Sequence, residues 1–505
     1  MTLSNITPEA KTKPYVSAQA ARPNFVPLLL TSLIVLYIGA IMALHWLRYE
    51  RFMNGFDLAF YQQAAWNTGQ GRFFAVSATD FSQSLLGTDV LLIFGLMSPL
   101  YLLVPSPFTL LFQETLVVGL GAIPVYWLAR DHLHSRTAGL TLALVYLLLP
   151  GVQNGNLYEL RERPLAMSFL LFAFYYYQRG RFWPFIVFSL LALSCRPENG
   201  LVLVMLALYG FIGQQHKTQG WRFVAGPFLL GAGWFALATL LIIPSASTGS
   251  IALAENFAGG SPFAAGLVLF TNPAEFFPGN ALVGKFLYFP FLLLPLLFLP
   301  LGRPGVLLMA LPSLALNLLS VRPIQWNAYD YHYQGSIIPW LLIATIFSLE
   351  KWPTELLKPL RLPWFKLKKA GPGLVLGMTL LVYLVFNIGG LSIPDTVRTD
   401  NGVAKILSRS VQPRWEAGKE LLKLIPDDAP LAITNLWASH VPPRQGLWLF
   451  REKSLYSLHP TREAQYIFAD LRAEDDKKLL DSLSLTEWQV LAEKQSYIVL
   501  KRINS

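Results

Sequence analysis

The sequence predicts a polytopic α-helical membrane protein with about eleven transmembrane helices and a small C-terminal α/β domain. Hydrophobic residues make up 53% of the 505 residues and charged residues only 14%, whereas soluble proteins keep about a quarter charged. Stretches such as 25–46, 223–243 and 373–388 carry essentially no charge and are long enough to cross a bilayer. After residue 390 the charges become dense and short β-type runs alternate with helical ones.

The first 24 residues form a polar segment that we expect to be a cytoplasmic tail. Lys11, Lys13 and Arg22 precede the first apolar run. That run is too long for a signal-peptide core and no small-residue cleavage site follows it, so we expect a retained anchor. The net charge of +10 fits basic loops that orient a membrane protein, and we expect no nucleic-acid partner. The lone cysteine, Cys195, excludes an intrachain disulfide.

Residues 25–390 form the expected membrane domain. The predicted spans are 25–46, 107–129, 137–151, 164–178, 181–195, 200–213, 222–243, 283–300, 304–320, 335–349 and 372–390. Three of them have only about 15 residues, so we expect these to pack inside the bundle.

The apolar run 85–104 is ambiguous, because two glycines, an aspartate and a proline interrupt it. Basic loops prefer the cytoplasmic side. With a cytoplasmic N-terminus and no crossing at 85–104, the loops that lie inside are 130–136, 178–181, 214–222, 302–303 and 350–369. We therefore expect 85–104 to be an interfacial or re-entrant part of the first outer loop, 47–106.

Residues 391–505 are expected to form a soluble α/β domain on the extracytoplasmic side, because eleven crossings place it opposite the N-terminus. The predicted strands lie at 430–434, 448–450, 466–468 and 497–500.

Unusual polar residues fall in the outer loops. Asp57 follows the first span within 54–67, where Phe56, Phe60 and Ala64 share a helical face, with Asn67 near it. This spacing predicts a short helix that lies along the membrane. The candidate cavity residues in the other outer loops are Glu159, Arg161, Glu162, Arg163, Arg196, Glu198, Asn199, Asp330 and His332.

Ionisable groups at a membrane edge are costly unless they pair or act chemically, so this set indicates a polar cavity. Arginines bind phosphate oxygens in bidentate fashion, and a carboxylate can take a proton from an attacking hydroxyl. An apolar groove beside them would hold a lipid tail. The combination suggests transfer of a group from a lipid phosphate carrier.

Each residue also has a plainer interpretation. Asp57 could cap a surface helix, and residues 161–163 could be a solvated salt-bridge loop. Arg196 and Glu198 could pair with each other at a span end. His332 stands among three tyrosines and fits a hydrogen-bonded interfacial residue better than a metal ligand. P-loop, zinc-peptidase and serine-elbow motifs are absent from the sequence.

The pattern resembles a bacterial membrane-protein family that carries a domain-of-unknown-function label and is prominent in cyanobacteria and actinobacteria. The segments that carry this resemblance are GFDLAFYQQAAWN at 55–67, PSPFTLL at 105–111, PVYWLAR at 124–130, NLYE at 156–159, RPENGL at 196–201 and YHYQ at 331–334. They cover nearly the whole chain from about residue 45.

That family is in turn similar to the GT-C glycosyltransferases, which include the protein O-mannosyltransferases and the aminoarabinose transferase of lipid A. The resemblance implies a GT-C-like arrangement of helices, membrane-parallel helices in the first outer loop and a sugar donor on polyprenyl phosphate. It gives Asp57 the place of the catalytic base, and Arg161, Arg163 and Arg196 would bind the donor phosphate.

Two departures from that pattern stand out. Such relatives often carry an Asp-Glu pair where this chain has Asp57 and Leu58. Where a His-Pro-like sequence is expected after 156–159, this chain has Arg161, Glu162 and Arg163. A metal or proton shuttle at that place is accordingly less favoured.

The resulting hypothesis is an inverting glycosyltransferase of the bacterial inner membrane and cell envelope, acting on a lipid, glycan or protein acceptor. No cofactor is required, because arginines can neutralise the leaving phosphate, although a divalent metal stays open. The alternatives are a transporter or lipid flippase that uses the same outward-facing cavity, and a scaffold or receptor displaying its outer domain. Transporters place ionisable groups near the midplane, in repeated halves, whereas here they crowd one edge.

Overall fold

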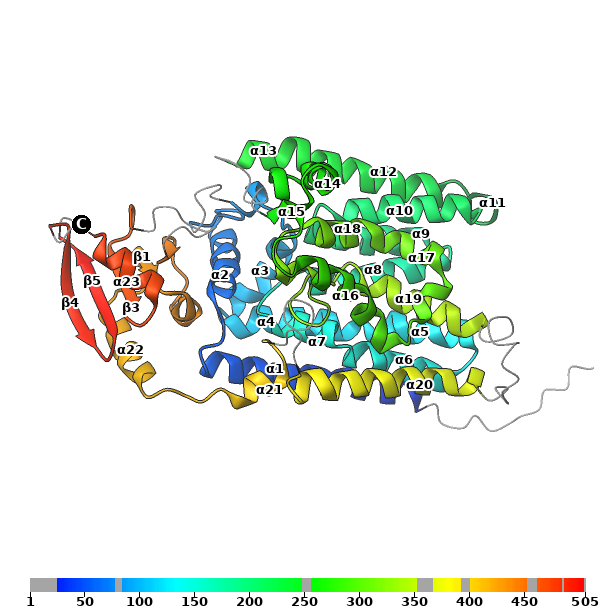
Figure 1. The fold of residues 1–505 in the computed structure, drawn as a ribbon, viewed down its shortest axis with the longest axis horizontal. Coiled ribbons are helices and arrows are strands. Elements are labelled where there is room, and N and C mark those ends of the chain that lie inside the picture. The colour runs from blue at the N-terminus through cyan, green and yellow to red at the C-terminus, as the bar shows by residue number, and fades with distance from the viewer. Residues whose placement is uncertain are drawn as a thin grey trace, which may run out of the picture.

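The computed structural model describes residues 25–77, 84–247, 256–351, 367–391, 400–451, 461–483 and 486–503. The predicted tail 1–24 and residues 352–366 of the last basic loop lie outside this part. Figure 1 shows an elongated helical body with a smaller sheet-containing unit at one end.

Most predicted spans coincide with helix in the structure, whereas 283–300 and 304–320 are divided into short α-helices and 3₁₀ turns. The main helices of the body are α1 (Val26–Glu50), α4 (Pro107–Leu120), α5 (Ala122–Leu133), α6 (Arg136–Leu148), α7 (Pro150–Leu157), α8 (Glu162–Gln178), α9 (Phe182–Cys195), α10 (Asn199–Ile212), α12 (Arg222–Leu237), α16 (Ala281–Leu293), α18 (Leu311–Leu319), α19 (Ile338–Lys351) and α20 (Leu367–Val382). Two of these helices have a serine N-cap. The side chains of Ser106 and Ser135 accept hydrogen bonds from N–H groups in the first turns of α4 and α6.

Helix length limits which of these can cross a bilayer alone. Within the described residues, the segments long and apolar enough are Val26–Glu50, Pro107–Leu133, Arg222–Ala246 and Ala370–Ile388. The pair α6 and α7, bent by 45°, could supply a fifth. The remaining apolar helices are shorter, so the count of eleven crossings stays a prediction. α8 is buried along most of its length, as expected of a short span inside the bundle.

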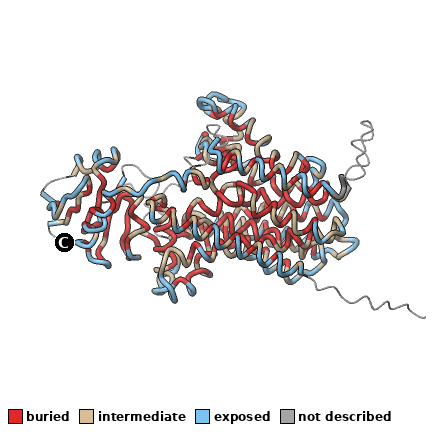
Figure 2. Tube along the Cα trace, turned by 90° about the horizontal axis from the view of Figure 1, so that it is seen from below, coloured by how far each residue is buried: buried red, intermediate tan, exposed pale blue. Residues whose placement is uncertain are grey.

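The helical body is apolar on its outside as well as in its core. Figure 2 shows buried segments running through the middle with exposed ones around them. Large apolar side chains face outward along the long helices, for example Leu36 at 68% exposure and Leu240 at 70%. Contiguous exposed apolar surface of this kind suits contact with lipid rather than water.

The ambiguous run 85–104 becomes a 3₁₀ turn (Leu85–Gly87) followed by α3 (Ile93–Leu103). At 1.5 Å per residue, α3 is about 16 Å long, roughly half the hydrocarbon thickness. It packs beside α2 and α4. This geometry agrees with a segment that does not cross.

The described parts of the loops predicted to be cytoplasmic lie together at one end of the body. His132, in the last turn of α5, bonds Glu350 at 3.1 Å and Gln178 at 3.0 Å. Gln219 donates to the carbonyl of Gln178, and Arg303 donates to the carbonyl of Phe347. α11 (Gln215–Thr218) marks this end in Figure 1, opposite the sheet.

The C-terminal part forms a mixed five-stranded sheet in the order β2-β1-β3-β5-β4. The strands are β1 (Leu431–Ile433), β2 (Leu447–Leu449), β3 (Tyr466–Asp470), β4 (Trp488–Lys494) and β5 (Tyr497–Arg502). β1 pairs in parallel with β2 and β3, while β5 is antiparallel to β3 and β4. Four strands match the sequence prediction and β4 was missed. The accompanying helices are α21 (Val403–Ser408), α22 (Arg414–Leu422), α23 (Glu474–Asp481) and the 3₁₀ helix η12 (Asn435–His440).

The helix α2 (Phe56–Gly69) lies between the two parts. Figure 1 shows it running across the direction of α1, next to the sheet unit. The sequence predicts one buried face, but α2 is buried on nearly all sides. Gln63 donates to the carbonyl of Gln445 at 2.8 Å, and Ser77 bonds both the N–H and the carbonyl of Leu447. α2 is therefore packed between protein surfaces rather than against lipid alone.

Candidate functional site

The N-terminus of α2 is held by side chains from two distant segments. Its N-cap residue, Gly55, has no side chain to cap the helix. The Glu159 carboxylate accepts from the N–H of Gly55 at 2.7 Å and of Leu58 at 3.0 Å. Asn435 of η12 accepts from the N–H of Phe56 at 2.7 Å. Anionic and amide oxygens are the groups a helix N-terminus binds best.

Asp57 lies in this first turn, and its carboxylate forms an ion pair with Arg161. Arg161 also donates to the hydroxyl of Tyr61 at 3.1 Å, and its guanidinium lies over the rings of Tyr61 and Tyr158. The side chains of Asp57 and Arg161 keep 14% and 12% of their surface exposed. The pair is therefore largely shielded but can still be reached.

A second charged network lies beside this pair. Arg196 contacts Asp89 at 2.5 Å, Glu198 at 2.6 Å and Glu162 at 2.7 Å. Arg163 contacts Glu198 at 2.9 Å. Residues 161–163 are thus enclosed rather than a solvated loop, and Arg196 and Glu198 do pair as the plainer interpretation proposes.

Carboxylates outnumber arginines in this cluster. Five of them (Asp57, Asp89, Glu159, Glu162 and Glu198) accompany three arginines (Arg161, Arg163 and Arg196). Burial and the neighbouring Asp57 raise the pKa of Glu159 to about 7. Burial also raises the pKa of Asp89, and Arg196 opposes that effect. Glu159 therefore titrates near neutral pH.

The loop that follows α18 closes the cluster from another side. A side chain at Gly335 would collide with the backbone of Arg163, since a Cβ there would lie 2.4 Å from the Arg163 carbonyl. Asp330 accepts from the N–H of Asn401 at 3.3 Å, and burial raises its pKa to about 7. Arg48, at the end of α1, donates to the Asn401 side chain at 3.0 Å.

His332 and Asn199 lie inside the protein. The ring of His332 stacks on Tyr333 and lies near Tyr158, and burial lowers its pKa well below the ordinary value. Its Nδ1 has no hydrogen-bond partner in the described part of the chain. Asn199 donates to the carbonyl of Ala192 and accepts from Ser336, both at 2.8 Å. Asn199 thus fixes the start of α10 from within the bundle.

The described residues contain no group of three or more His, Cys, Asp or Glu side chains arranged to hold a metal ion. The acidic side chains of the cluster point to arginines and backbone N–H groups instead.

Several of the residues that the sequence predicts for the site contact one another in the structure, and further partners were not predicted. Asp89, Arg48, Tyr61 and Asn435 complete the contacts described above, and Glu114 of α4 accepts from the N–H of Arg161 at 3.3 Å. Glu114 could have been found, because a lone carboxylate inside an apolar run is a marker of function or pairing. Asn435 gives no such signal in the sequence.

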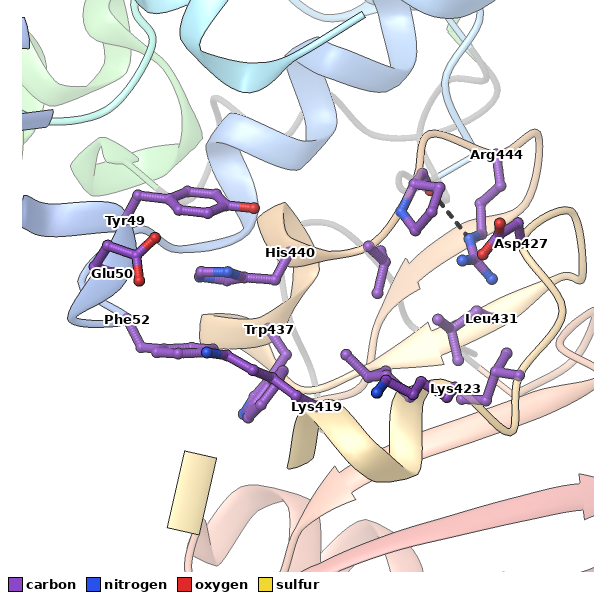
Figure 3. Close-up of a pocket in the computed structure, with 14 residues that line it drawn as sticks. Tyr49, Glu50, Phe52, Lys419, Lys423, Asp427, Leu431, Trp437, His440 and Arg444 are labelled. Atoms are coloured by element: carbon purple, nitrogen blue, oxygen red, sulfur yellow. Dashed lines mark hydrogen bonds between the residues drawn. The ribbon is translucent and has the colours of Figure 1, made fainter. Parts of the chain in front are cut away.

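A cavity of about 340 Å³ lies between the end of α1 and the sheet unit, at the small end of the range for ligand pockets. Figure 3 shows the ring of His440 between Tyr49 and Phe52, with centroid distances of 4.0 Å to each. Lys419 of α22 and Lys423, which directly follows that helix, line the cavity from the other side. None of the predicted site residues lines it.

The fold is similar to that of two solved structures of one protein. The crystal structure of ArnT from Cupriavidus metallidurans bound to undecaprenyl phosphate matches with a TM-score of 0.53 and 12% identity, covering 94% of this chain and 99% of that one. The apo structure of the same protein gives 0.52 and 13%, covering 93% and 98%. The apo oligosaccharyltransferase of Archaeoglobus fulgidus gives 0.45 and 9%, covering 88% and 70%. The ArnT matches show that this chain shares the overall fold of ArnT.

The family follows from the sequence itself. A family model described as "Predicted membrane protein (DUF2079)" matches residues 48–499, and the chain belongs to this family. No curated protein sequence matches the chain. The family that the motifs predict is confirmed, and the overall fold agrees with the helix arrangement that the GT-C resemblance implies.

Proposed function

We propose that the protein is an inverting glycosyltransferase that moves a sugar from a polyprenyl-phosphate donor to a hydroxyl of an extracytoplasmic acceptor. The observation that carries this proposal is the pair formed by Asp57 and Arg161. A carboxylate able to take a proton lies beside a guanidinium able to bind phosphate. The fold shared with an ArnT structure that holds undecaprenyl phosphate supports the class of donor.

The reaction needs one proton transfer and one displacement. Asp57 takes the proton of the acceptor hydroxyl as its oxygen attacks the anomeric carbon of the donor. The bond between that carbon and the phosphate oxygen breaks, and the polyprenyl phosphate leaves with the electron pair. Inversion follows because the nucleophile attacks opposite the leaving group. Positive groups near the departing phosphate lower the barrier.

Of the three arginines, Arg161 is the best placed for that role. Its guanidinium contacts Asp57 itself, whereas Arg163 and Arg196 are engaged with Glu162, Glu198 and Asp89. Arg161 can move from the carboxylate to an arriving phosphate, which would free Asp57 to act as the base. Arg163 and Arg196 then serve mainly to keep the surrounding carboxylates in place and to add positive potential.

The same proposal sets the orientation in the membrane. The N-terminus lies in the cytoplasm of a bacterium, the helical body in the inner membrane, and the sheet unit outside. The separation of the basic loops from the charged cluster, at opposite ends of the body, supports this arrangement. The acceptor, a lipid, glycan or protein, would reach Asp57 from the side of the sheet unit.

Incubation of the purified protein with a panel of polyprenyl-phosphate sugars and extracted membrane acceptors tests the activity. We expect release of polyprenyl phosphate with loss of the sugar donor, and no dependence on added divalent metal. The alternative is a transporter or flippase. Movement of a lipid-linked sugar across vesicles with no bond broken would favour it, and absence of both donor consumption and polyprenyl-phosphate binding would remove the enzyme assignment.

A further inference from the structure

The first turn of α2 depends on caps that come from outside the helix. Three backbone N–H groups at the start of α2, those of Gly55, Phe56 and Leu58, donate to the side chains of Glu159 and Asn435. The proposed base, Asp57, stands between two residues whose backbone N–H groups are fixed in this way. Its carboxylate position therefore follows from the two caps.

Gly55 shows how closely the two caps converge. A Cβ at Gly55 would lie 3.1 Å from Oε1 of Glu159 and 3.2 Å from Oδ1 of Asn435. The backbone of Gly55 has φ −96° and ψ −159°, an extended conformation that alanine also adopts. Glycine is used here for space, so that an acid from the helical body and an amide from the sheet unit can bind one helix end.

We propose that Asn435 is a positioning residue for Asp57, so that the reaction centre is complete only when the sheet unit is docked on the helical body. This inference rests on the proposed function. It gives the sheet unit a part in the chemistry, because η12 both carries the cap and forms a wall of the cavity that Trp437 and His440 line.

The docking surface supplies a matched control. Gln63 and Ser77 bind the sheet unit through Gln445 and Leu447, away from the first turn of α2. Removing the Ser77 hydroxyl weakens docking by two hydrogen bonds but leaves the N–H groups of Gly55, Phe56 and Leu58 capped. A role limited to docking predicts equal effects at Ser77 and Asn435.

The test compares Asn435→Leu, Gly55→Ala and Ser77→Ala in the full-length protein. Asn435 is exposed, so leucine there does not disturb a core. We expect kcat to fall by about tenfold to a hundredfold in the first two variants, since misplacement of a catalytic group has that effect. The KM for the donor should change less than about twofold, and Ser77→Ala should keep the kcat of the wild type.

Hydrogen exchange supplies a readout that needs no activity. Loss of a cap should speed exchange of the amides at 55–58 by about fivefold in Asn435→Leu, with no change in Ser77→Ala. Unchanged exchange, or faster exchange with unchanged kcat, overturns the inference. If the wild-type protein consumes no donor, the proposed function fails first, and the exchange result alone still decides whether Asn435 fixes the helix end.

Discussion

The carboxylate of Asp57 and the guanidinium of Arg161 form an ion pair across 104 residues of sequence. The pair joins the first turn of α2 to the N-cap residue of α8. It brings the proposed base and the proposed phosphate ligand into contact before any substrate is bound. Arg161 thereby neutralises Asp57 in this state, and an anionic donor would compete for the same guanidinium.

Arg161 should affect both donor binding and turnover. In Arg161→Ala we expect kcat/KM for the donor to fall by about a hundredfold, because one charged hydrogen-bond donor to the leaving group is lost. Arg161→Lys should recover only part of this, since lysine lacks the planar fork. Donor-turnover kinetics give the comparison, and a loss below about threefold in Arg161→Ala would contradict a phosphate contact.

Arg196 should instead contribute to the free energy of unfolding of the protein. It contacts Asp89, Glu162 and Glu198, so Arg196→Ala leaves buried carboxylates without their cation and should cost about 3–5 kcal/mol. Arg179, whose side chain is 50% exposed and paired with Asp131, is the control, and its alanine variant should cost less than about 1 kcal/mol. Thermal unfolding in detergent measures both. Equal losses would argue against a buried network.

Glu159 should give the pH profile a step near neutrality. Its pKa is raised to about 7 by burial and by Asp57, so below that pH it is mostly protonated and binds the N–H groups of Gly55 and Leu58 less well. Turnover should therefore rise with pH through about 7 in the wild type. In Glu159→Gln, which cannot titrate, this step should be absent and kcat lower. A step that persists in the variant would assign it to another group.

The orientation can be read by cysteine labelling, because the only native cysteine, Cys195, is buried. Ser482 lies exposed in the sheet unit and Lys217 exposed in α11. In intact cells a membrane-impermeant maleimide should label Ser482→Cys and leave Lys217→Cys unlabelled. Labelling in the opposite sense would reverse the proposed topology.

Apolar runs made the helices predictable, because a lipid environment forces long uncharged segments into helix. In the segment 283–320, hydropathy alone did not predict the observed secondary structure. Pro290, Pro295, Pro300 and Pro304 remove backbone donors, and the two predicted spans appear as short helices and 3₁₀ turns. β4 was missed because it is an edge strand with an exposed face that carries charge.

Apart from Asp89, the members of the charged cluster were predictable because charge at a membrane edge is costly. Their pairing was not, since Asp57 with Arg161 and Arg196 with Asp89 join residues about a hundred positions apart. Asn435 could not have been found, because an exposed amide in a polar domain has no distinguishing pattern. Its importance comes only from the packing of α2 between the two parts.

The central claim, that Asp57 is the base of a sugar transfer, is tested most directly by donor turnover in the wild type and in Asp57→Asn. Asparagine keeps the size of the side chain but cannot take the proton. We expect the wild type to convert donor to polyprenyl phosphate, and the variant to bind polyprenyl phosphate and unfold at a similar temperature but to lose turnover by at least about a hundredfold. Turnover by the variant at the wild-type rate would contradict the assignment of Asp57.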